Sequence, residues 1–180
     1  MATTLPAKKL LWIDLEMTGL EPEQDLILEV AALVTDWEFN ELARYEAVVG
    51  HDVKSVKKLL DANPWWATEA ASRDSLLKLV EDGKSEQQIQ QELLALIHEH
   101  FDDEPAVLAG NSIHQDRRFI RKHWSLIEAR LHYRMLDVSS WKIVMEGKYG
   151  YEFEKKSVHR AMDDINESIA ELKFYLTRLK

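Results

Sequence analysis

Two acidic residues, Asp14 and Glu16, stand two positions apart in the stretch 10–20, whose first half alternates like a β-strand. Because successive side chains of a strand leave opposite faces, both carboxylates are expected on one face and the apolar residues on the other. Paired carboxylates beside so apolar a run are costly to desolvate, and oxygen ligands of this kind suit Mg²⁺ or Mn²⁺. A half-exposed edge strand with solvated acids is the alternative, and this stretch alone favours neither.

A third acid, Asp164, comes near the start of a long amphipathic stretch that predicts a helix over about 160–179. At 100° per residue, Asp164 is expected to face the sheet, whereas Asp163 turns toward the polar side. An inward acid needs a partner, and the pattern places no Lys or Arg one turn away on that face. For Asp163 a solvated acid favoured by the helix dipole is the simpler interpretation.

Two further residues could join these acids. His159 stands just before the predicted helix, and its unperturbed pKa would let it take a proton from water near neutral pH, although a lone His is more often surface or core. Asp116 follows a short apolar strand and opens the next helix. Such junctions are where α/β sites assemble, but an acid in a first helical turn is also a common stabilising feature.

The composition limits the partners. With 180 residues the chain is expected to form one domain over residues 1–180, and its lack of Cys suits a reducing, cytoplasmic compartment. No apolar run has the length of a signal peptide or a membrane span. The net charge of -9 works against a long polyanion, so a nucleic-acid substrate would have to be short and held by few contacts and metal ions.

The periodicity predicts an α/β fold. Strands are expected at 10–17, 26–35, 39–49, 106–109 and 133–138, the first three as an antiparallel meander. Helices are expected from 53, over 65–80, after Ser85, from about 115, over 139–145 and over 160–179, with a loop at 148–156. A meander followed by alternating strands and helices indicates a mixed sheet with helices on both faces.

Three segments together resemble the motifs of the DEDDh 3′-to-5′ exonucleases, and nearly the whole chain resembles the oligoribonuclease family within them. The segments are Trp12-Ile13-Asp14-Leu15-Glu16-Met17-Thr18-Gly19-Leu20, Gly110-Asn111-Ser112-Ile113-His114-Gln115-Asp116-Arg117-Arg118-Phe119, and His159-Arg160-Ala161-Met162-Asp163-Asp164-Ile165, together with His132-Tyr133-Arg134-Met135-Leu136-Asp137-Val138-Ser139. Four acids and a His in this order are far more specific than any single motif.

The resemblance implies an RNase H-like fold, a mixed five-stranded sheet flanked by helices. It implies two Mg²⁺ or Mn²⁺ ions at Asp14, Glu16, Asp116 and Asp164, with His159 as the general base. The activity implied is 3′-to-5′ hydrolysis of very short oligoribonucleotides, especially dinucleotides, to 5′-mononucleotides. This mechanism agrees with the chemistry expected of the acids themselves.

The resemblance also implies how the substrate is held. Leu20 would wedge between two bases, although packing at its turn is an equally simple role. The site would be completed across a homodimer, with Tyr133 active and with Arg134, Ser139 and Ser140 of the second subunit capping a 5′-phosphate together with Ser112 of the first. A cap of this kind would select short substrates, because an internal phosphate cannot make the same bonds. Otherwise Tyr133 and Arg134 simply begin a strand, and Ser139 caps a helix.

One region departs from the family pattern. Oligoribonucleases have a Trp, then a His, then Ser-Gly-Leu, whereas residues 63–74 keep Trp65, Trp66 and Ser72 but contain neither His nor Gly. A base could stack on Trp65 or on Trp66, or either could be core.

Two alternative functions stay open. One is a DEDDh exonuclease for longer strands, which the acidic balance disfavours. The other is a non-catalytic dimeric binding module, which a missing acid would favour.

Overall fold

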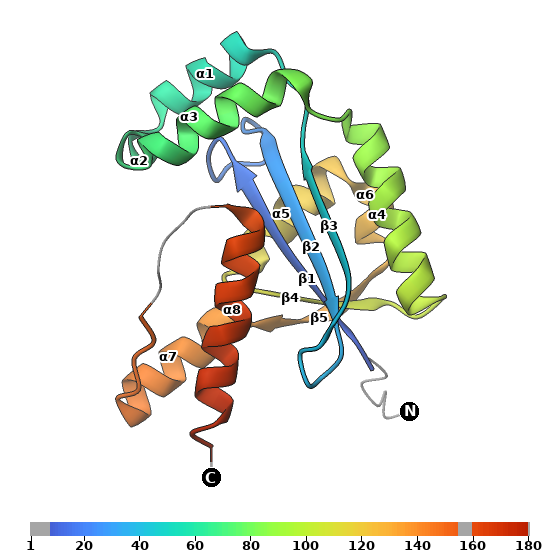
Figure 1. The fold of residues 1–180 in the computed structure, drawn as a ribbon, viewed down its shortest axis with the longest axis vertical. Coiled ribbons are helices and arrows are strands. Elements are labelled where there is room, and N and C mark those ends of the chain that lie inside the picture. Colours follow the sequence, from blue (N-terminus) through green and yellow to red (C-terminus); the bar gives the residue numbers. More distant parts are fainter. Residues whose placement is uncertain (1–7, 155–159, 180) are drawn as a thin grey trace.

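The computed structural model describes residues 8–154 and 160–179. Its centre is one five-stranded sheet of order β3-β2-β1-β4-β5 (Figure 1). The strands are β1 Leu10–Met17, β2 Ile27–Thr35, β3 Glu41–Val48, β4 Ala106–Gly110 and β5 Leu131–Asp137. The helices are α1 Val53–Ala62, α2 Pro64–Thr68, α3 Ala70–Leu79, α4 Glu86–Phe101, α5 His114–His123, α6 Ser125–Glu128, α7 Val138–Tyr149 and α8 Ala161–Leu176, with a 3₁₀ turn at Val80–Asp82.

The sheet is mixed, as the element order predicts. β1, β2 and β3 pair antiparallel, whereas β4 pairs parallel with both β1 and β5. The parallel strands β1, β4 and β5 therefore end at the same edge of the sheet. That edge is where binding sites of α/β proteins assemble.

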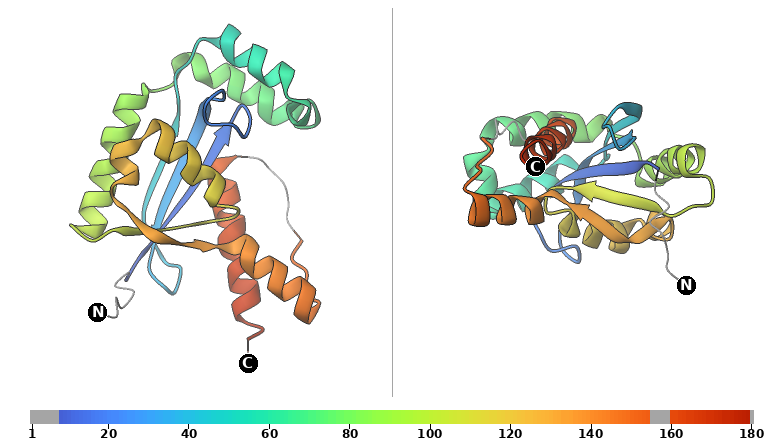
Figure 2. Two further views of the ribbon diagram at one scale, coloured as in Figure 1. Left: turned by 180° about the vertical axis from the view of Figure 1, so that it is seen from behind. Right: turned by 90° about the horizontal axis from the view of Figure 1, so that it is seen from below.

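Each face of the sheet is covered by helices, as Figures 1 and 2 show from several sides. Leu11, Ile13 and Leu15 pack into a core with α4, α5 and α6. Leu10 and Trp12 point the other way, into a core with α8. The two-residue alternation of β1 thus confirms the predicted faces, and Asp14 and Glu16 belong to the face that α8 covers.

The predicted helix over 65–80 is wrong in one respect: it is divided into α2, α3 and the 3₁₀ turn. Glu69, between α2 and α3, has φ −104° and ψ 43°, outside the helical region. The break allows α2 to turn its Trp66 into a small third core with Leu28, Leu60 and other apolar residues of α1 and α3. The indole N–H of Trp66 donates to the carbonyl oxygen of Met17 at 3.2 Å, which joins this layer to the end of β1.

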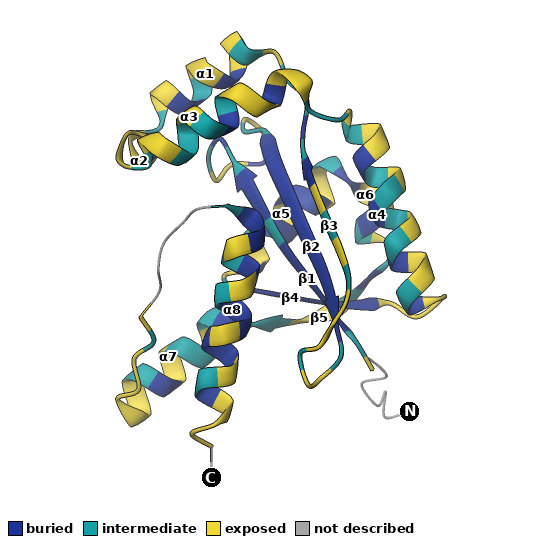
Figure 3. Ribbon diagram, viewed as in Figure 1, coloured by how far each residue is buried: buried dark blue, intermediate teal, exposed yellow. Residues whose placement is uncertain are grey.

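Most other predicted boundaries shift by a few residues. α7 runs on to Tyr149 and ends at Gly150, whose φ of 69° lies in the left-handed region, so the predicted loop begins later than residue 148. β3 begins at Glu41 because Phe39 has a φ of 62° and belongs to the preceding turn. The buried residues are concentrated in β1, β2 and the inner faces of the helices (Figure 3). None of the helices in residues 8–154 and 160–179 is both long and apolar enough to cross a membrane.

The two neighbouring tryptophans give a direct test of this packing. Trp66 is 1% exposed and Trp65 is 44% exposed. We expect Trp66→Ala to lower the free energy of unfolding by about 3–5 kcal/mol, because it empties a core position. Trp65→Ala should lower it by less than about 1 kcal/mol. Urea denaturation of both variants measures the difference, and equal losses would contradict the assignment of Trp66 to the core.

Candidate active site

Three predicted acids converge at one place. Carboxylate oxygens of Asp14, Glu16 and Asp164 all lie within 4.8 Å of one another. Asp14 and Glu16 come from the same face of β1, and Asp164 comes from the first turn of α8, which packs on that face. Asp163 is exposed, so the helical spacing distinguishes the two neighbouring acids correctly.

The fourth predicted acid, Asp116, reaches the same strand from the opposite side. It lies in the first turn of α5 and is buried. Its Oδ1 accepts a hydrogen bond of 2.9 Å from the backbone N–H of Leu15, the residue between Asp14 and Glu16. Asp116 lies outside the tight group of three but lines a cavity of about 420 Å³ together with Asp14.

Burial makes two of these acids, Glu16 and Asp116, hard to ionise. Burial raises the pKa of Glu16 to about 8, and repulsion from Asp164, Glu29 and Asp116 adds to this effect, while Arg160 opposes it. Burial likewise raises the pKa of Asp116 to about 7, against the hydrogen bond from Leu15. A cation bound among them would favour their ionised forms. An all-oxygen donor set of this kind fits a hard divalent ion.

The positive charge that the sequence analysis did not find on this face comes from Arg160, the residue directly before α8. Its guanidinium donates to both carboxylate oxygens of Glu29, with Nη2 to Oε1 at 2.6 Å and Nε to Oε2 at 3.0 Å. Glu29 lies on β2 directly opposite Glu16. The sequence signal for the role of Glu29 is that it is the single charged residue inside an otherwise apolar strand.

Leu20 stands between two cavities and is 58% exposed. Its turn is held by Asp25, whose carboxylate accepts from the hydroxyl of Thr18 at 2.8 Å and from the backbone N–H of Glu21 at 2.9 Å. A Cβ at Gly19 would lie 2.5 Å from an oxygen of Asp25, so a larger residue there would displace the carboxylate that holds the turn. The exposed side chain of Leu20 is therefore carried on a closely bonded turn.

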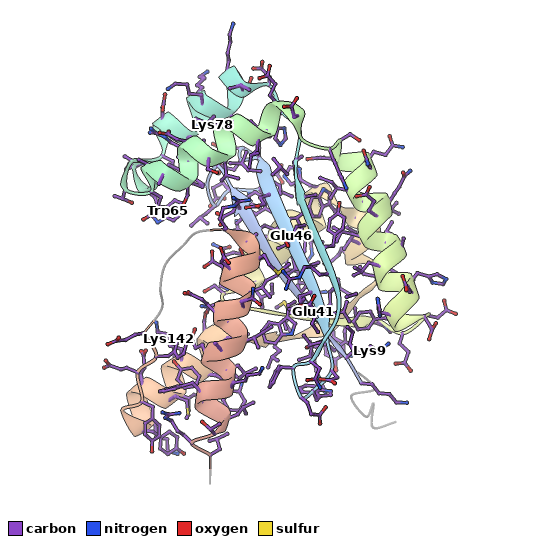
Figure 4. All side chains as sticks on the ribbon, in the orientation of Figure 1. Lys9, Glu41, Glu46, Trp65, Lys78 and Lys142 are labelled. Carbon is purple, nitrogen blue, oxygen red and sulfur yellow. The ribbon has the colours of Figure 1, made fainter. Side chains whose placement is uncertain are left out.

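The first of these cavities is apolar, measures about 310 Å³ and is bordered by Glu16, Leu20 and Trp65. Figure 4 shows Trp65 on the side of the α1–α3 layer that faces the start of α8. Trp66 contributes to the wall but is buried in the core behind it. Of the two tryptophans, Trp65 is the one whose ring is accessible to a ligand.

The second cavity, which Asp116 also lines, is bordered by polar groups that follow β4. Ser112 has a φ of 51°, and its hydroxyl oxygen lies 2.9 Å from that of Ser139. The carboxylate of Asp137 accepts from the backbone N–H groups of Ser112 at 3.0 Å and of Ser139 at 2.9 Å. Ser139 thus contacts Ser112 within one chain, and Asp137 is a supporting residue that the sequence analysis did not single out.

The remaining predicted residues are spread over the surface. Tyr133 is 66% exposed on β5, an edge strand, and the guanidinium of Arg134 lies 5.2 Å from the centroid of its ring. Ser140 is exposed on α7. His159 lies outside the described residues.

Comparisons with known proteins identify the family of this chain. The exonuclease family RNase T matches residues 11–172. The oligoribonuclease of Francisella tularensis subsp. novicida is 41% identical over 177 residues, covering 96% of this chain and 97% of the relative. The oligoribonuclease of Aeromonas hydrophila is 39% identical over 175 residues, covering 96% of each chain.

Among solved structures, E. coli exonuclease I bound to an oligonucleotide superposes with a TM-score of 0.68 at 15% identity. The alignment covers 96% of this chain but only 41% of that one, so it supports the fold alone. The sequence relatives, by contrast, match along almost their entire length and carry the assignment. The chain belongs to the oligoribonuclease family of RNase T-type exonucleases.

Proposed function

We propose that the chain is a 3′-to-5′ exoribonuclease that degrades very short oligoribonucleotides, dinucleotides above all, to 5′-mononucleotides. The observation that carries this proposal is the convergence of Asp14, Glu16 and Asp164 within 4.8 Å in a member of an exonuclease family. We further propose that residues 1–180 act as a single domain in the cytoplasm, in keeping with the absence of Cys.

In this proposal Asp14, Glu16, Asp116 and Asp164 hold two Mg²⁺ or Mn²⁺ ions. Divalent ions supply activation of water and stabilisation of charge on the phosphate and on the leaving oxygen. The protein supplies the oxygen ligands and fixes their positions: Asp116 is held by the N–H of Leu15, and Asp164 by the packing of α8. His159 takes the proton from the attacking water, a role that suits a histidine because the reference pKa of imidazole lies near neutrality.

The two cavities offer one binding space for each nucleotide of a dinucleotide. We propose that the 3′-terminal base enters the apolar cavity and stacks on Trp65, while the preceding nucleotide lies along the cavity of Ser112 and Asp116. Leu20, which borders both, would separate the two bases. The ring of Trp65 would also make up part of the contact expected from the His that residues 63–74 lack.

A second copy of the chain completes the site in this proposal. Exposed apolar side chains lie on the edge strand β5 and on α7, among them Met135, Ile143 and Val144. An exposed edge strand with apolar neighbours is a surface that a protein usually covers. The second copy would bring Tyr133 to the site and would place Arg134, Ser139 and Ser140 at a terminal 5′-phosphate beside Ser112. Because Ser139 is already bonded to Ser112 in its own chain, the main contribution falls to the exposed Tyr133 and Arg134.

Removal of one acid tests the metal site. We expect Asp164→Asn or Asp14→Ala to lower the rate of dinucleotide hydrolysis by about 1,000-fold, because metal ions contribute several kcal/mol of transition-state stabilisation. Asp163→Asn is the matched control, since Asp163 is the exposed neighbour of Asp164 and should leave the rate unchanged. Full activity of Asp164→Asn under Mn²⁺ would refute the metal assignment.

The raised pKa values predict how metal-free protein responds to pH. The pKa of Glu16 is 4.5 in its ordinary environment and about 8 in the fold, so the folded state binds the proton more tightly. The free energy of unfolding should therefore fall as pH rises from about 5 to 8. Added Mg²⁺ or Mn²⁺ should raise the melting temperature, and more so at pH 8 than at pH 5.5. Thermal scans in EDTA and in added metal measure these melting temperatures. Glu16→Gln should flatten the pH dependence of the metal-free protein. If metal raised the melting temperature of the wild type equally at both pH values, the raised pKa of Glu16 would be contradicted.

A series of rates against RNA length tests the substrate. We expect the highest kcat/KM for 5′-phosphorylated dinucleotides and a clear fall by seven nucleotides. Trp65→Ala should raise KM by about 10- to 100-fold, the usual range for a lost base–aromatic stack. The exposed Trp37, remote from both cavities, gives the control Trp37→Ala.

The variant Arg134→Ala tests the phosphate cap. It should lose activity selectively on the dinucleotide, and an equal fall in rate for the dinucleotide and the seven-mer would exclude the cap.

A further inference from the structure

An ion pair between the buried Glu29 and the half-buried Arg160 lies beside the acidic cluster, and neither residue belongs to the four proposed metal ligands. Glu29 is 4% exposed and lies near the start of β2, the interior strand between β1 and β3. Arg160 meets it in a fork, with Nη2 to Oε1 at 2.6 Å and Nε to Oε2 at 3.0 Å. A two-pronged contact of this kind fixes both the distance and the orientation of the two groups.

On the strand side, the pair adjoins Glu16. Glu29 is the direct cross-strand partner of Glu16 in the register of β1 and β2. Like charges placed directly opposite each other repel, so Glu29 is a costly residue at this position unless a cation neutralises it. Arg160 is that cation, and it leaves the charge of Glu16 available for a metal ion.

On the helix side, the pair lies at the start of α8. Arg160 has an extended backbone, φ −130° and ψ 130°, and its own side chain makes no capping hydrogen bond. Instead, the backbone N–H of Ala161 donates to Oε2 of Glu29 at 3.5 Å. The positive end of the helix dipole at this position stabilises the negative charge of Glu29. The carbonyl oxygen of Arg160 accepts from the N–H of Asp164 at 3.0 Å. The first turn of α8 is thus attached to β2 at Glu29, which lies beside Glu16 of β1. Glu16 is in turn one of the acids close to Asp164.

We propose that Glu29 and Arg160 are positioning residues, whose ion pair fixes the first turn of α8 against β2 and so holds Asp164 at metal-binding distance from Glu16. This inference rests on the proposed metal site. Without the pair, α8 keeps its apolar contacts through Ile165, Ile169 and Leu172, but its first turn is free to move away from the sheet. The expected loss is therefore in metal affinity and local order rather than in the fold as a whole.

The test uses the full chain with substitutions of Arg160, of Glu29 and of a control residue. Arg160→Gln removes the fork, Arg160→Lys keeps the charge with a single donor group, and Arg44→Gln is the matched control. Arg44 makes the same two-pronged contact with Glu41, at 3.0 and 2.8 Å, but on the exposed edge strand β3 away from the acids. Mn²⁺ binding is measured by titration calorimetry, and hydrogen exchange of residues 161–168 is measured in metal-free protein.

We expect Arg160→Gln to weaken Mn²⁺ binding by about 10- to 100-fold, the usual cost of losing a group that orients a metal ligand. Exchange should become faster in the first turn of α8 and stay unchanged in α4. Arg160→Lys should restore part of the affinity, Arg44→Gln should change neither quantity, and saturating Mn²⁺ should restore most of the kcat of Arg160→Gln. Glu29→Gln should resemble Arg160→Gln, and the double variant should lose little more than either single one.

Two results would overturn the proposal: unchanged exchange in the first turn of α8, or Mn²⁺ binding that is equal or tighter in Arg160→Gln. Tighter binding would mean that Arg160 acts only as a competing charge. Failure of the underlying function is recognised separately. In that case Asp164→Asn would bind Mn²⁺ as the wild type does, while the exchange measurement on metal-free protein would still report whether the pair holds the helix.

Discussion

The constraint on which this structure depends is the repulsion among carboxylates gathered at one partly buried place. Two full negative charges within 4.8 Å of each other repel by about 3 kcal/mol, even at an effective dielectric constant near 20. Burial of Glu16 adds a desolvation cost, which appears as the rise of its pKa to about 8. A fold selected only for stability would separate these side chains. The surrounding contacts are best understood by how they keep the acids together.

Three elements hold the four acids: the strand β1 and the helices α5 and α8. β1 lies in the middle: its ladder with β2 runs through Asp14 and Glu16, and its ladder with β4 holds the preceding residues 10–12. Asp164 is delivered by a helix on one face, and Asp116 by a helix whose core contacts lie on the opposite face. The hydrogen bond from Leu15 to Asp116 joins the two arrangements through the backbone of β1. Each acid is thus fixed by an element that is itself packed into the core.

Much of this could be predicted because it follows from local periodicity. The two-residue repeat of β1 placed Asp14 and Glu16 on one face, and the helical repeat of residues 160–179 distinguished Asp164 from Asp163. The ion pair of Glu29 and Arg160 could not be predicted in this way, because it joins residues 131 positions apart and depends on strand register and two long side chains. The same limit applies to Trp65 and Trp66, which are the same residue type in adjacent positions. Only the break at Glu69 and the packing of α2 decide which indole is buried.

The charge balance of the surface bears on the length of substrate. Affinity for a long nucleic acid grows with the number of Lys and Arg side chains that reach phosphates. On α5, beside the second cavity, the basic side chains are paired with acids: Arg118 with Glu21, Arg121 with Glu128, and Lys122 with Glu23.

Arg118 also donates to the carbonyl oxygen of Leu20 at 3.2 Å, so its charge supports the turn between the cavities. A strand extending past the two cavities would meet neutralised pairs rather than free cations on this helix, in a chain of net charge -9. In the proposed function a dinucleotide needs none of these extra contacts, because its single internal phosphate would lie at the acids, where bound metal ions would supply the positive charge. Preference for short substrates then follows from charge pairing on the protein as much as from any wall that blocks a longer chain.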